Sequence, residues 1–350
     1  DGVPEDNEAA ILWYTRAAQQ ADEQAQYNVA LMHARGEGTR IDLNEAVKWY
    51  QLSADLGLAA AQHNLAHLYD VGHGVPENNQ KAISLYKRAA AQGHRDAQYA
   101  IALMYDEGDG IAEDDSVAAD WYERAAIRGH VSAQFNLAIM YDVGEGVPED
   151  NGLAIKWYTA AATQEHADSQ LNLGIMYENG EGTEVDHAQA MNWYRRAADQ
   201  GHRDAQYAVA LMFDEGMGVA EDNVEAIAWY TRAAEQGDAM AQNNLGAMYD
   251  AGEGTTPDDR EAVKWYRLSA DQGNSIAQNN LGAMYYAGEG IRENKTQAYK
   301  WFYIAGELGN DDARNNREIA ATGLRTSQVK KGKKLALEWL KDHGESSVSR

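Results

Sequence analysis

Two histidines at helical spacing are the residues of this sequence best placed to bind a metal ion. His63 and His67 stand four residues apart in "HNLAH", a spacing at which two side chains on one helix can hold the same ion. The zinc motif of hydrolytic enzymes needs a glutamate directly after the first histidine, and Asn64 stands there instead. We therefore expect a surface pair or a partner contact here, and no metal site.

An acidic, glycine-rich stretch is the second candidate for chemistry. A calcium loop needs oxygen ligands at its first, third and fifth positions, but "DEGDGIAEDD" from Asp106 to Asp115 has glycine at the third and the fifth. The Lys-Ser/Thr ending of a phosphate-binding loop is also missing. Glycine supplies positive φ at the end of one helix, and the carboxylates that follow suit the start of the next. The stretch is predicted to be a connector.

These residues recur in a repeat of 36 residues. Trp-Tyr pairs keep this spacing, and so do the Gly-x-Gly and Ala-Gln pairs. The Trp-Tyr pairs begin at residues 13, 49, 121, 157, 193, 229 and 265. A single histidine recurs in the same frame at His94, His130, His166 and His202, which indicates a turn or capping role. Length alone suggests two or three globular domains, but the repeat predicts one solenoid.

Each repeat is predicted to contain two helices. An Asp or Asn stands seven residues before each Trp, where its side chain can cap a helix start. Glu or Gln three residues later completes a capping box in five repeats, at Glu45, Gln189, Glu225, Glu261 and Gln297. Glycine is predicted to end this helix in a left-handed cap. Ala21 and Glu165 replace that glycine, so we expect these two turns to differ.

Composition excludes several partners. The net charge of −25 makes nucleic acid and anionic membranes poor partners, and no apolar run is long enough to span a bilayer. Cysteine is absent, which excludes disulfides.

The chain begins with "DGVPEDN", the middle of a motif seen again at Gly146 to Asn151, so we expect that a segment preceding Asp1 is missing. We predict no cofactor, and the oligomeric state stays open.

The repeat resembles that of the Sel1-like family, relatives of the tetratricopeptide repeats. Asn243 to Gly273 reads "NNLGAMYDAGEGTTPDDREAVKWYRLSADQG", which is close to the family pattern. The resemblance implies an all-α, right-handed superhelical solenoid of 36-residue antiparallel helix pairs, with a concave face that holds a protein or peptide. It further implies an adaptor or scaffold and an exported bacterial protein, either periplasmic or secreted. Members with a disulfide in each repeat are excluded by the lack of cysteine.

The predicted boundaries follow from the repeat. We expect the solenoid over residues 1–320, with an orphan helix at 6–20 and eight full helix pairs over 22–308. The repeat pattern then decays, and a C-terminal capping helix is predicted at 321–343. Residues 344–350 are expected to be a disordered tail.

A binding groove is predicted at positions that the repeat pattern leaves variable. Two such positions lie one turn apart on the first helix of each repeat, opposite its core side. In six successive repeats they are apolar or aromatic: Tyr27, Leu31, His63, His67, Tyr99, Leu103, Phe135, Ile139, Leu171, Ile175, Tyr207 and Leu211. Asp70, Asp106, Asp142 and Asp214 are predicted to form an acidic rim. The alternative is that these side chains pack between neighbouring repeats.

The leading hypothesis is therefore a non-enzymatic scaffold that binds a protein or peptide with apolar anchors and basic flanks. A carbohydrate-binding envelope protein, with the Tyr/Phe ladder stacking on sugar rings, is the second hypothesis. A hydrolase is the third. It has less support because repeats contact only their neighbours and no nucleophile elbow is present, so we predict no catalytic residues.

Overall fold

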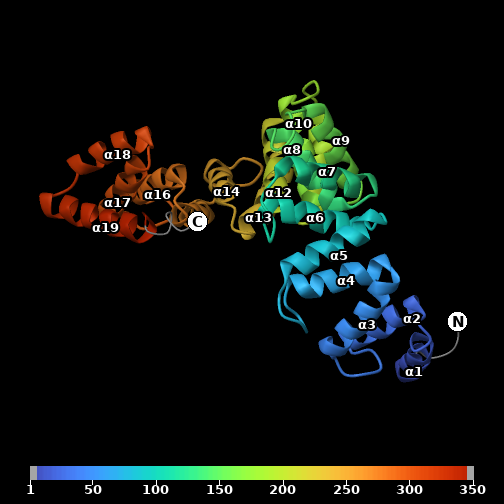
Figure 1. Ribbon diagram of the computed structural model, residues 1–350. Helices are drawn as coiled ribbons and strands as arrows, with labels where there is room; N and C mark the ends of the chain where they lie inside the picture. The colour runs from blue at the N-terminus through green and yellow to red at the C-terminus, as the bar shows by residue number, and fades with distance from the viewer. Residues whose placement is uncertain (1–5, 345–350) are drawn as a thin grey trace. The chain divides into compact units, whose positions relative to one another are not determined.

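The computed structural model describes residues 6–344 and contains, within that range, nineteen α-helices and no strand. The chain forms two compact units that divide between Ser169 and Gln170. The prediction of an all-α fold of stacked helix pairs is confirmed (Figure 1). The helices of the first unit are α1 (Asn7–Ala18), α2 (Glu23–Arg35), α3 (Leu43–Leu56), α4 (Ala59–Asp70), α5 (Asn79–Ala91), α6 (Arg95–Glu107), α7 (Asp115–Ile127), α8 (Val131–Val143) and α9 (Asn151–Ala162).

The second unit continues the same alternation of helices. Helix α10 (Ala167–Asn179) includes the boundary residues. It is followed by α11 (His187–Asp199), α12 (Arg203–Glu215), α13 (Asn223–Glu235), α14 (Ala239–Ala251), α15 (Asp259–Asp271), α16 (Ser275–Ala287), α17 (Lys295–Glu307), α18 (Asp311–Thr322) and α19 (Thr326–Gly344). No helix within residues 6–344 is long and apolar enough to cross a bilayer.

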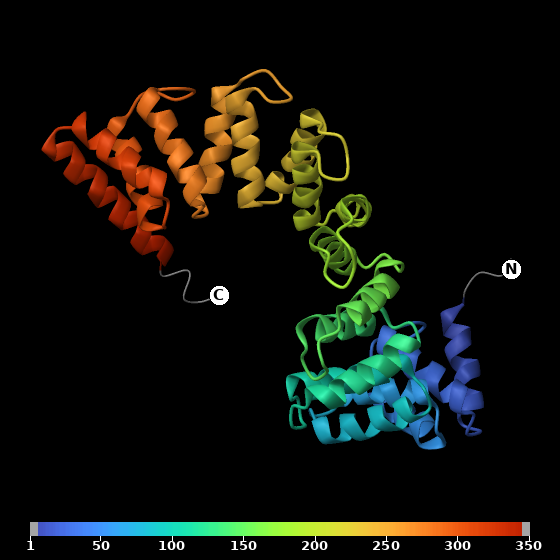
Figure 2. The same cartoon turned by 90° about the horizontal axis from the view of Figure 1, so that it is seen from above.

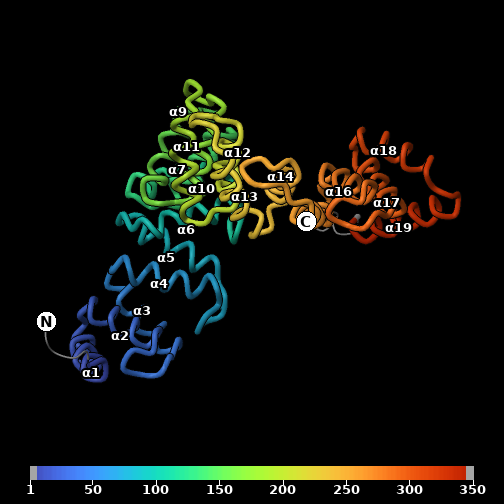
Figure 3. Tube along the Cα trace, turned by 180° about the vertical axis from the view of Figure 1, so that it is seen from behind, coloured from blue at the N-terminus to red at the C-terminus, as the bar shows by residue number. Residues whose placement is uncertain are grey.

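From α1 to α9 in the first unit, and from α11 to α18 in the second, every helix packs on the next one along the chain. Helix α2 packs on α3 within a repeat, and α3 packs on α4 of the next repeat. The Cα trace reverses at each turn (Figure 3), and the orange and red helices of the second unit stand side by side (Figure 2). The Tyr of every Trp-Tyr pair after the first is buried in this packing, whereas Tyr14 of α1 is exposed. The largest fully buried side chains include Tyr122, Tyr158, Tyr194, Tyr230 and Tyr266.

The predicted helix caps are present, but the capping box is not formed as expected. The Asp42 carboxylate accepts from the backbone N–H of Glu45 at 3.0 Å, as an N-cap should. The box also requires Glu45 to accept from the N–H of Asp42. That N–H instead donates to the carbonyl of His33, in the preceding helix. Tertiary structure already satisfies this donor, and the same bond recurs at the other four predicted boxes, from Asp186, Asp222, Asp258 and Asn294.

Glycines end the second helices in the left-handed conformation, as predicted, with Gly57 at φ +111° and Gly93 at φ +84°. The expectation that the turns at Ala21 and Glu165 differ is wrong. Ala21 has φ +60° and Glu165 has φ +63°, so both keep the glycine geometry despite their side chains. The stacking of repeats fixes this turn, and the two residues carry the resulting steric strain.

The acidic loop contacts the preceding repeat, a role that the sequence did not reveal. A Cβ placed on Gly146 would lie 2.5 Å from the carbonyl carbon of Asp115, at the start of α7. A Cβ on Gly74 would likewise lie 2.7 Å from the carbonyl oxygen of Leu43. The second glycine of Gly-x-Gly is thus needed for close approach between repeats as well as for its positive φ.

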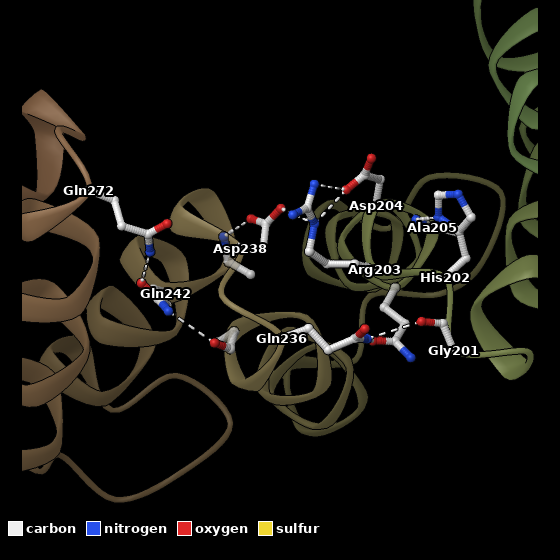
Figure 4. A network of polar contacts seen from close by, with 12 residues as sticks. Gly201, His202, Arg203, Asp204, Ala205, Gln236, Asp238, Gln242 and Gln272 are labelled. Carbon is white, nitrogen blue, oxygen red and sulfur yellow. Dashed lines mark hydrogen bonds and ion pairs between the residues drawn. The ribbon is translucent and has the colours of Figure 1, made fainter. Parts of the chain in front are cut away.

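A glutamine in each first helix joins the ends of successive second helices. The Nε2 of Gln242 donates to the carbonyl of Ala234, and its Oε1 accepts from Nε2 of Gln272 at 2.8 Å (Figure 4). The bond between the two glutamines spans 30 residues of sequence. It recurs for the pairs Gln62–Gln92, Gln134–Gln164, Gln170–Gln200 and Gln206–Gln236.

The C-terminal helix begins later than predicted. Helix α18 ends before Gly323, and α19 runs from Thr326 to Gly344, whereas the prediction was 321–343. The difference arises because residues 323–325 form a turn. Helix α19 packs on α17, where Trp339 contacts Trp301 at a ring distance of 6.0 Å. Of the tail predicted at 344–350, Gly344 is helical and the remainder lies outside the described residues.

Candidate functional site

Ten of the twelve predicted groove side chains are half-buried, whereas His67 and Ile175 are exposed. In the first unit, the aromatic position of each first helix packs against the buried Tyr of its own repeat. Tyr99 lies 5.8 Å from Tyr122, and Phe135 lies 6.1 Å from Tyr158, measured between ring centroids. His63 contacts Tyr86 and Tyr27 contacts Tyr50 in the same way. Part of each ring therefore stabilises its own repeat.

Histidines at the starts of first helices cover a second part of three of these rings. His94, His130, His166 and His202 cap α6, α8, α10 and α12, so the predicted capping role is confirmed. His130 stacks on Tyr99 at 4.2 Å, and His94 stacks on His63 at 4.8 Å. Burial lowers the pKa of His94, His130 and His166. The alternative of packing between repeats thus accounts for part of the surface of the rings of His63, Tyr99 and Phe135.

In the second unit, the predicted groove residues Leu171, Tyr207 and Leu211 are also half-buried, and Ile175 is exposed. Tyr207 lies 5.8 Å from Tyr230, which repeats the contact of the first unit. Burial, followed by the negative charge of Asp238, raises the pKa of Tyr207. The contribution of these residues to binding stays a prediction.

One pocket in the first unit brings several predicted residues together. We call it the acidic pocket; its volume is about 440 Å³. Helices α4, α5 and α6 and the loop after α6 supply its walls. The lining residues are His63, His67, Asp70, Tyr86, Asp96, Tyr99, Ala100, Leu103, Met104, Glu107 and Asp109. Four carboxylates thus line the pocket together with the apolar residues Ala100, Leu103 and Met104, and no Lys or Arg is among the lining residues.

Asp70 is the most constrained carboxylate of the acidic pocket. Its Oδ2 accepts from the hydroxyl of Tyr86 at 3.3 Å, whereas its Oδ1 is buried and has no hydrogen-bond partner. Burial raises the pKa of Asp70, and the nearby charge of Asp109 raises it further. A buried acceptor without a partner is costly, so a donor with a positive charge would be favoured at this atom.

The other predicted rim residues have the same bond to tyrosine. Asp106 accepts from Tyr122 at 2.8 Å, Asp214 from Tyr230 at 3.0 Å, and Asp142 from Tyr158. The tyrosine hydroxyl also accepts from an asparagine of the next repeat, as Asn136 donates to Tyr122. One oxygen of each rim carboxylate therefore has a structural role.

Sequence reasoning found five residues of the acidic pocket and missed three of its carboxylates. His63, His67, Asp70, Tyr99 and Leu103 were predicted and lie together. Asp96, Glu107 and Asp109 were missed. Aligning the repeats on their 36-residue spacing gives a signal for two of them, because Met240 and Ala251 occupy the positions of Asp96 and Glu107 four repeats later, whereas Glu253 keeps the charge of Asp109. Within residues 6–344, no three His, Asp or Glu side chains lie so that they could hold one metal ion together.

Compared with known protein families, the sequence matches the model of a single repeat family along most of its length. Nine consecutive matches to the Sel1 repeat model cover residues 1–22, 23–58, 59–94, 95–130, 131–166, 167–202, 203–238, 239–274 and 275–310. No curated protein matches the chain. One similar crystal structure is that of a protective antigen of uropathogenic Escherichia coli strains, at 32% identity and a TM-score of 0.68. The match covers 97% of this chain and 81% of that one.

A second similar structure is a Sel1 repeat protein from Oxalobacter formigenes. It is 31% identical to this chain, with a TM-score of 0.66, and the match covers 90% of this chain and 93% of that one. Both matches extend over nearly the whole chain, so both units have the repeat architecture of these proteins.

Proposed function

We propose that this chain, which belongs to the Sel1 repeat family, is a non-enzymatic scaffold whose acidic pocket receives a basic side chain of a partner protein. Proteins with this fold generally serve as protein-interaction scaffolds and are typically non-catalytic. The observation that carries the proposal is the buried, unpartnered Oδ1 of Asp70 within a pocket of four carboxylates.

The chemistry of the acidic pocket favours Arg or Lys over other side chains. Both have an apolar stem, which can lie against Leu103 and Tyr99, and a charged group that donates hydrogen bonds. The cation would donate to Asp70 and lie near Glu107 and Asp109. Tyr99 adds a ring face of the kind that attracts cations. A single anchor of this type, flanked by apolar residues, suits the half-buried positions on neighbouring first helices.

The test compares peptides that differ only in charge. An array presents arginine between apolar residues, with matched peptides in which citrulline, lysine or glutamate replaces it. We expect the full chain to bind the arginine and lysine peptides, and to bind the citrulline and glutamate peptides at least about tenfold more weakly, because the charge-assisted bond to Asp70 is lost. Equal binding of the arginine and citrulline peptides would contradict the proposal.

Asp214 supplies a matched control for Asp70. Both carboxylates accept from a buried tyrosine hydroxyl, but Met240 and Ala251 stand where the acidic pocket has Asp96 and Glu107. Asp70→Asn should weaken binding of the arginine peptide about tenfold, whereas Asp214→Asn should leave it unchanged. Equal effects of the two variants would assign the loss to the tyrosine bond rather than to the pocket.

The two alternative functions predict other outcomes. Binding on a glycan array that needs Tyr99 and Tyr207 but tolerates loss of Leu103 and Leu211 would favour a carbohydrate ligand. The stacking of His130 on Tyr99 covers part of the ring that a sugar would need, which weighs against this alternative. Turnover of generic ester, phosphate or β-lactam substrates would favour a hydrolase.

A further inference from the structure

A second pocket arises where the glutamine bond between neighbouring helices is broken. The first-helix glutamine accepts from a glutamine 30 residues later in five repeats. In the remaining three, Leu56, Arg128 and Leu308 stand at that later position. The three glutamines that face them are Gln26, Gln98 and Gln278, and in each the Oε1 is buried without a hydrogen-bond partner. In these three repeats the later glutamine, whose Nε2 is the donor in the other five, is replaced, and the oxygen therefore has no partner.

Only one of these three sites has a cation at the substituted position. Gln98 is 4% exposed, and its Nε2 donates to the carbonyl of Ala90 at 3.2 Å. Gln98 also lines a pocket of about 760 Å³ between the ends of α5 and α7 and the start of α6. We call it the arginine pocket; it is lined by Ala90, Ala91, Gly93, Gln98, Arg124, Ile127 and Arg128.

The charge of the arginine pocket is opposite to that of the chain. The protein contains 55 Asp and Glu against 30 Lys and Arg, yet the lining has two arginines and no carboxylate. Arg124 lies over the Trp121 ring, with its guanidinium carbon 4.5 Å from the ring centre. The Arg128 guanidinium lies against Gly93, where a Cβ would come within 2.9 Å of a guanidinium nitrogen. The glycine therefore leaves the space that Arg128 occupies.

The polar groups of this pocket define the ligand that would fit. The guanidinium groups only donate hydrogen bonds and suit a carboxylate, whereas Oε1 of Gln98 only accepts and needs a donor. Ile127 is 69% exposed and, with Ala91, offers an apolar surface beside these groups. We propose that the arginine pocket binds a small organic anion that has a hydroxyl or N–H donor next to its carboxylate.

Two sources share this chemistry. One is a free 2-hydroxy acid, and the other is an N-acylated amino acid, either free or at the end of a chain. In both, the carboxylate would pair with Arg128 and Arg124, and the adjacent O–H or N–H would donate to Gln98. No residue of the acidic pocket lines the arginine pocket, so the two proposals can fail independently.

The experiment measures binding to the full chain by calorimetry, with NMR titration as a second readout. Lactate represents the hydroxy acid, and N-acetylalanine represents the acylated amino acid. Acetate and sulfate lack the donor, and N-acetylalanine amide lacks the carboxylate. We expect saturable millimolar binding of lactate, of N-acetylalanine, or of both, and this result identifies the source. Acetate, sulfate and the amide should bind at least about tenfold more weakly, because each leaves one partner unsatisfied.

Arg128→Gln is the decisive variant, because it removes the cation and places glutamine where five other repeats already have it. We expect this variant to lose anion binding at least about tenfold and to melt at a higher temperature, since Gln98 regains its donor. Arg232→Gln makes the same charge change over Trp229 in the second unit and should leave binding unchanged.

Three outcomes would overturn the proposal. The first is the absence of saturable binding at millimolar concentration by either organic acid. The second is equal binding of acetate and sulfate, which would indicate general attraction of anions to two arginines. The third is unchanged binding in Arg128→Gln. A raised melting temperature in that variant without any loss of binding would show that the substitution restores the glutamine bond and that Arg128 has no ligand.

Discussion

At the scale of single residues, the capping histidines make the stability of the fold depend on pH. The Nδ1 atoms of His94, His130 and His166 accept from the backbone N–H three residues later. Burial lowers the pKa of all three below the value of about 6.5 that is usual for an unfolded chain, although Asp96 and Asp168 oppose the shift. The unfolded state therefore binds protons first as the pH falls. Stability from these caps is complete above about pH 6.5 and is lost below it.

The corresponding prediction concerns a variant with His94→Asn, His130→Asn and His166→Asn. Asparagine caps α16 and α18 in this protein without titrating, at Asn274 and Asn310. The variant should lose less stability than the original protein between about pH 7.5 and about pH 5 in urea unfolding. The raised pKa values of Asp70 and Asp250 act in the opposite direction, but they are common to both proteins. Identical pH dependence would exclude the histidines as its source.

At the scale of elements, the left-handed turns store strain at two positions. Ala21 ends the turn after α1 with φ +60°, where a Cβ is disfavoured and most repeats have glycine. We expect Ala21→Gly to raise the free energy of unfolding by about 0.5–1 kcal/mol, measured by urea denaturation. Ala17→Gly, in the helical part of α1, is the control and should lower it by about 1 kcal/mol. A loss of stability in Ala21→Gly would show that the turn carries no strain.

Sequence alone could predict these elements because their signals are local. Caps and glycine ends involve residues within one or two helical turns, and the 36-residue spacing is visible in the order of residues without knowledge of their contacts. The glutamine bond was missed because Gln242 and Gln272 lie 30 residues apart, on different elements of one repeat. The exposure of Phe135 depends on whether His166 covers its ring, at a centroid distance of 4.7 Å, and periodicity does not contain that information. Pockets likewise depend on departures from the repeat, such as Arg128.

At the scale of the whole molecule, a destabilising substitution in a solenoid lowers the stability mainly of the repeats around it. Helices pack mainly on those next to them in the chain, so stability is close to a sum of repeat and interface contributions. Trp157 of α9 is 6% exposed, and Trp157→Ala should cost about 3–5 kcal/mol because it leaves a large cavity. In a cooperative globule, this loss would lower the protection of all slowly exchanging amides together.

For this chain we expect a graded loss instead. Hydrogen exchange should show the largest loss of protection in α8 and α9 of Trp157→Ala, with a smaller loss in α4 and little change in α17. Trp13 occupies the same repeat position in α1 but is 66% exposed, so Trp13→Ala is the control and should cost less than about 1 kcal/mol. A uniform loss of protection from α2 to α17 in Trp157→Ala would show that the repeats unfold as one cooperative body. In that case, interfaces between repeats would dominate stability, and binding at either pocket would be coupled to the entire chain.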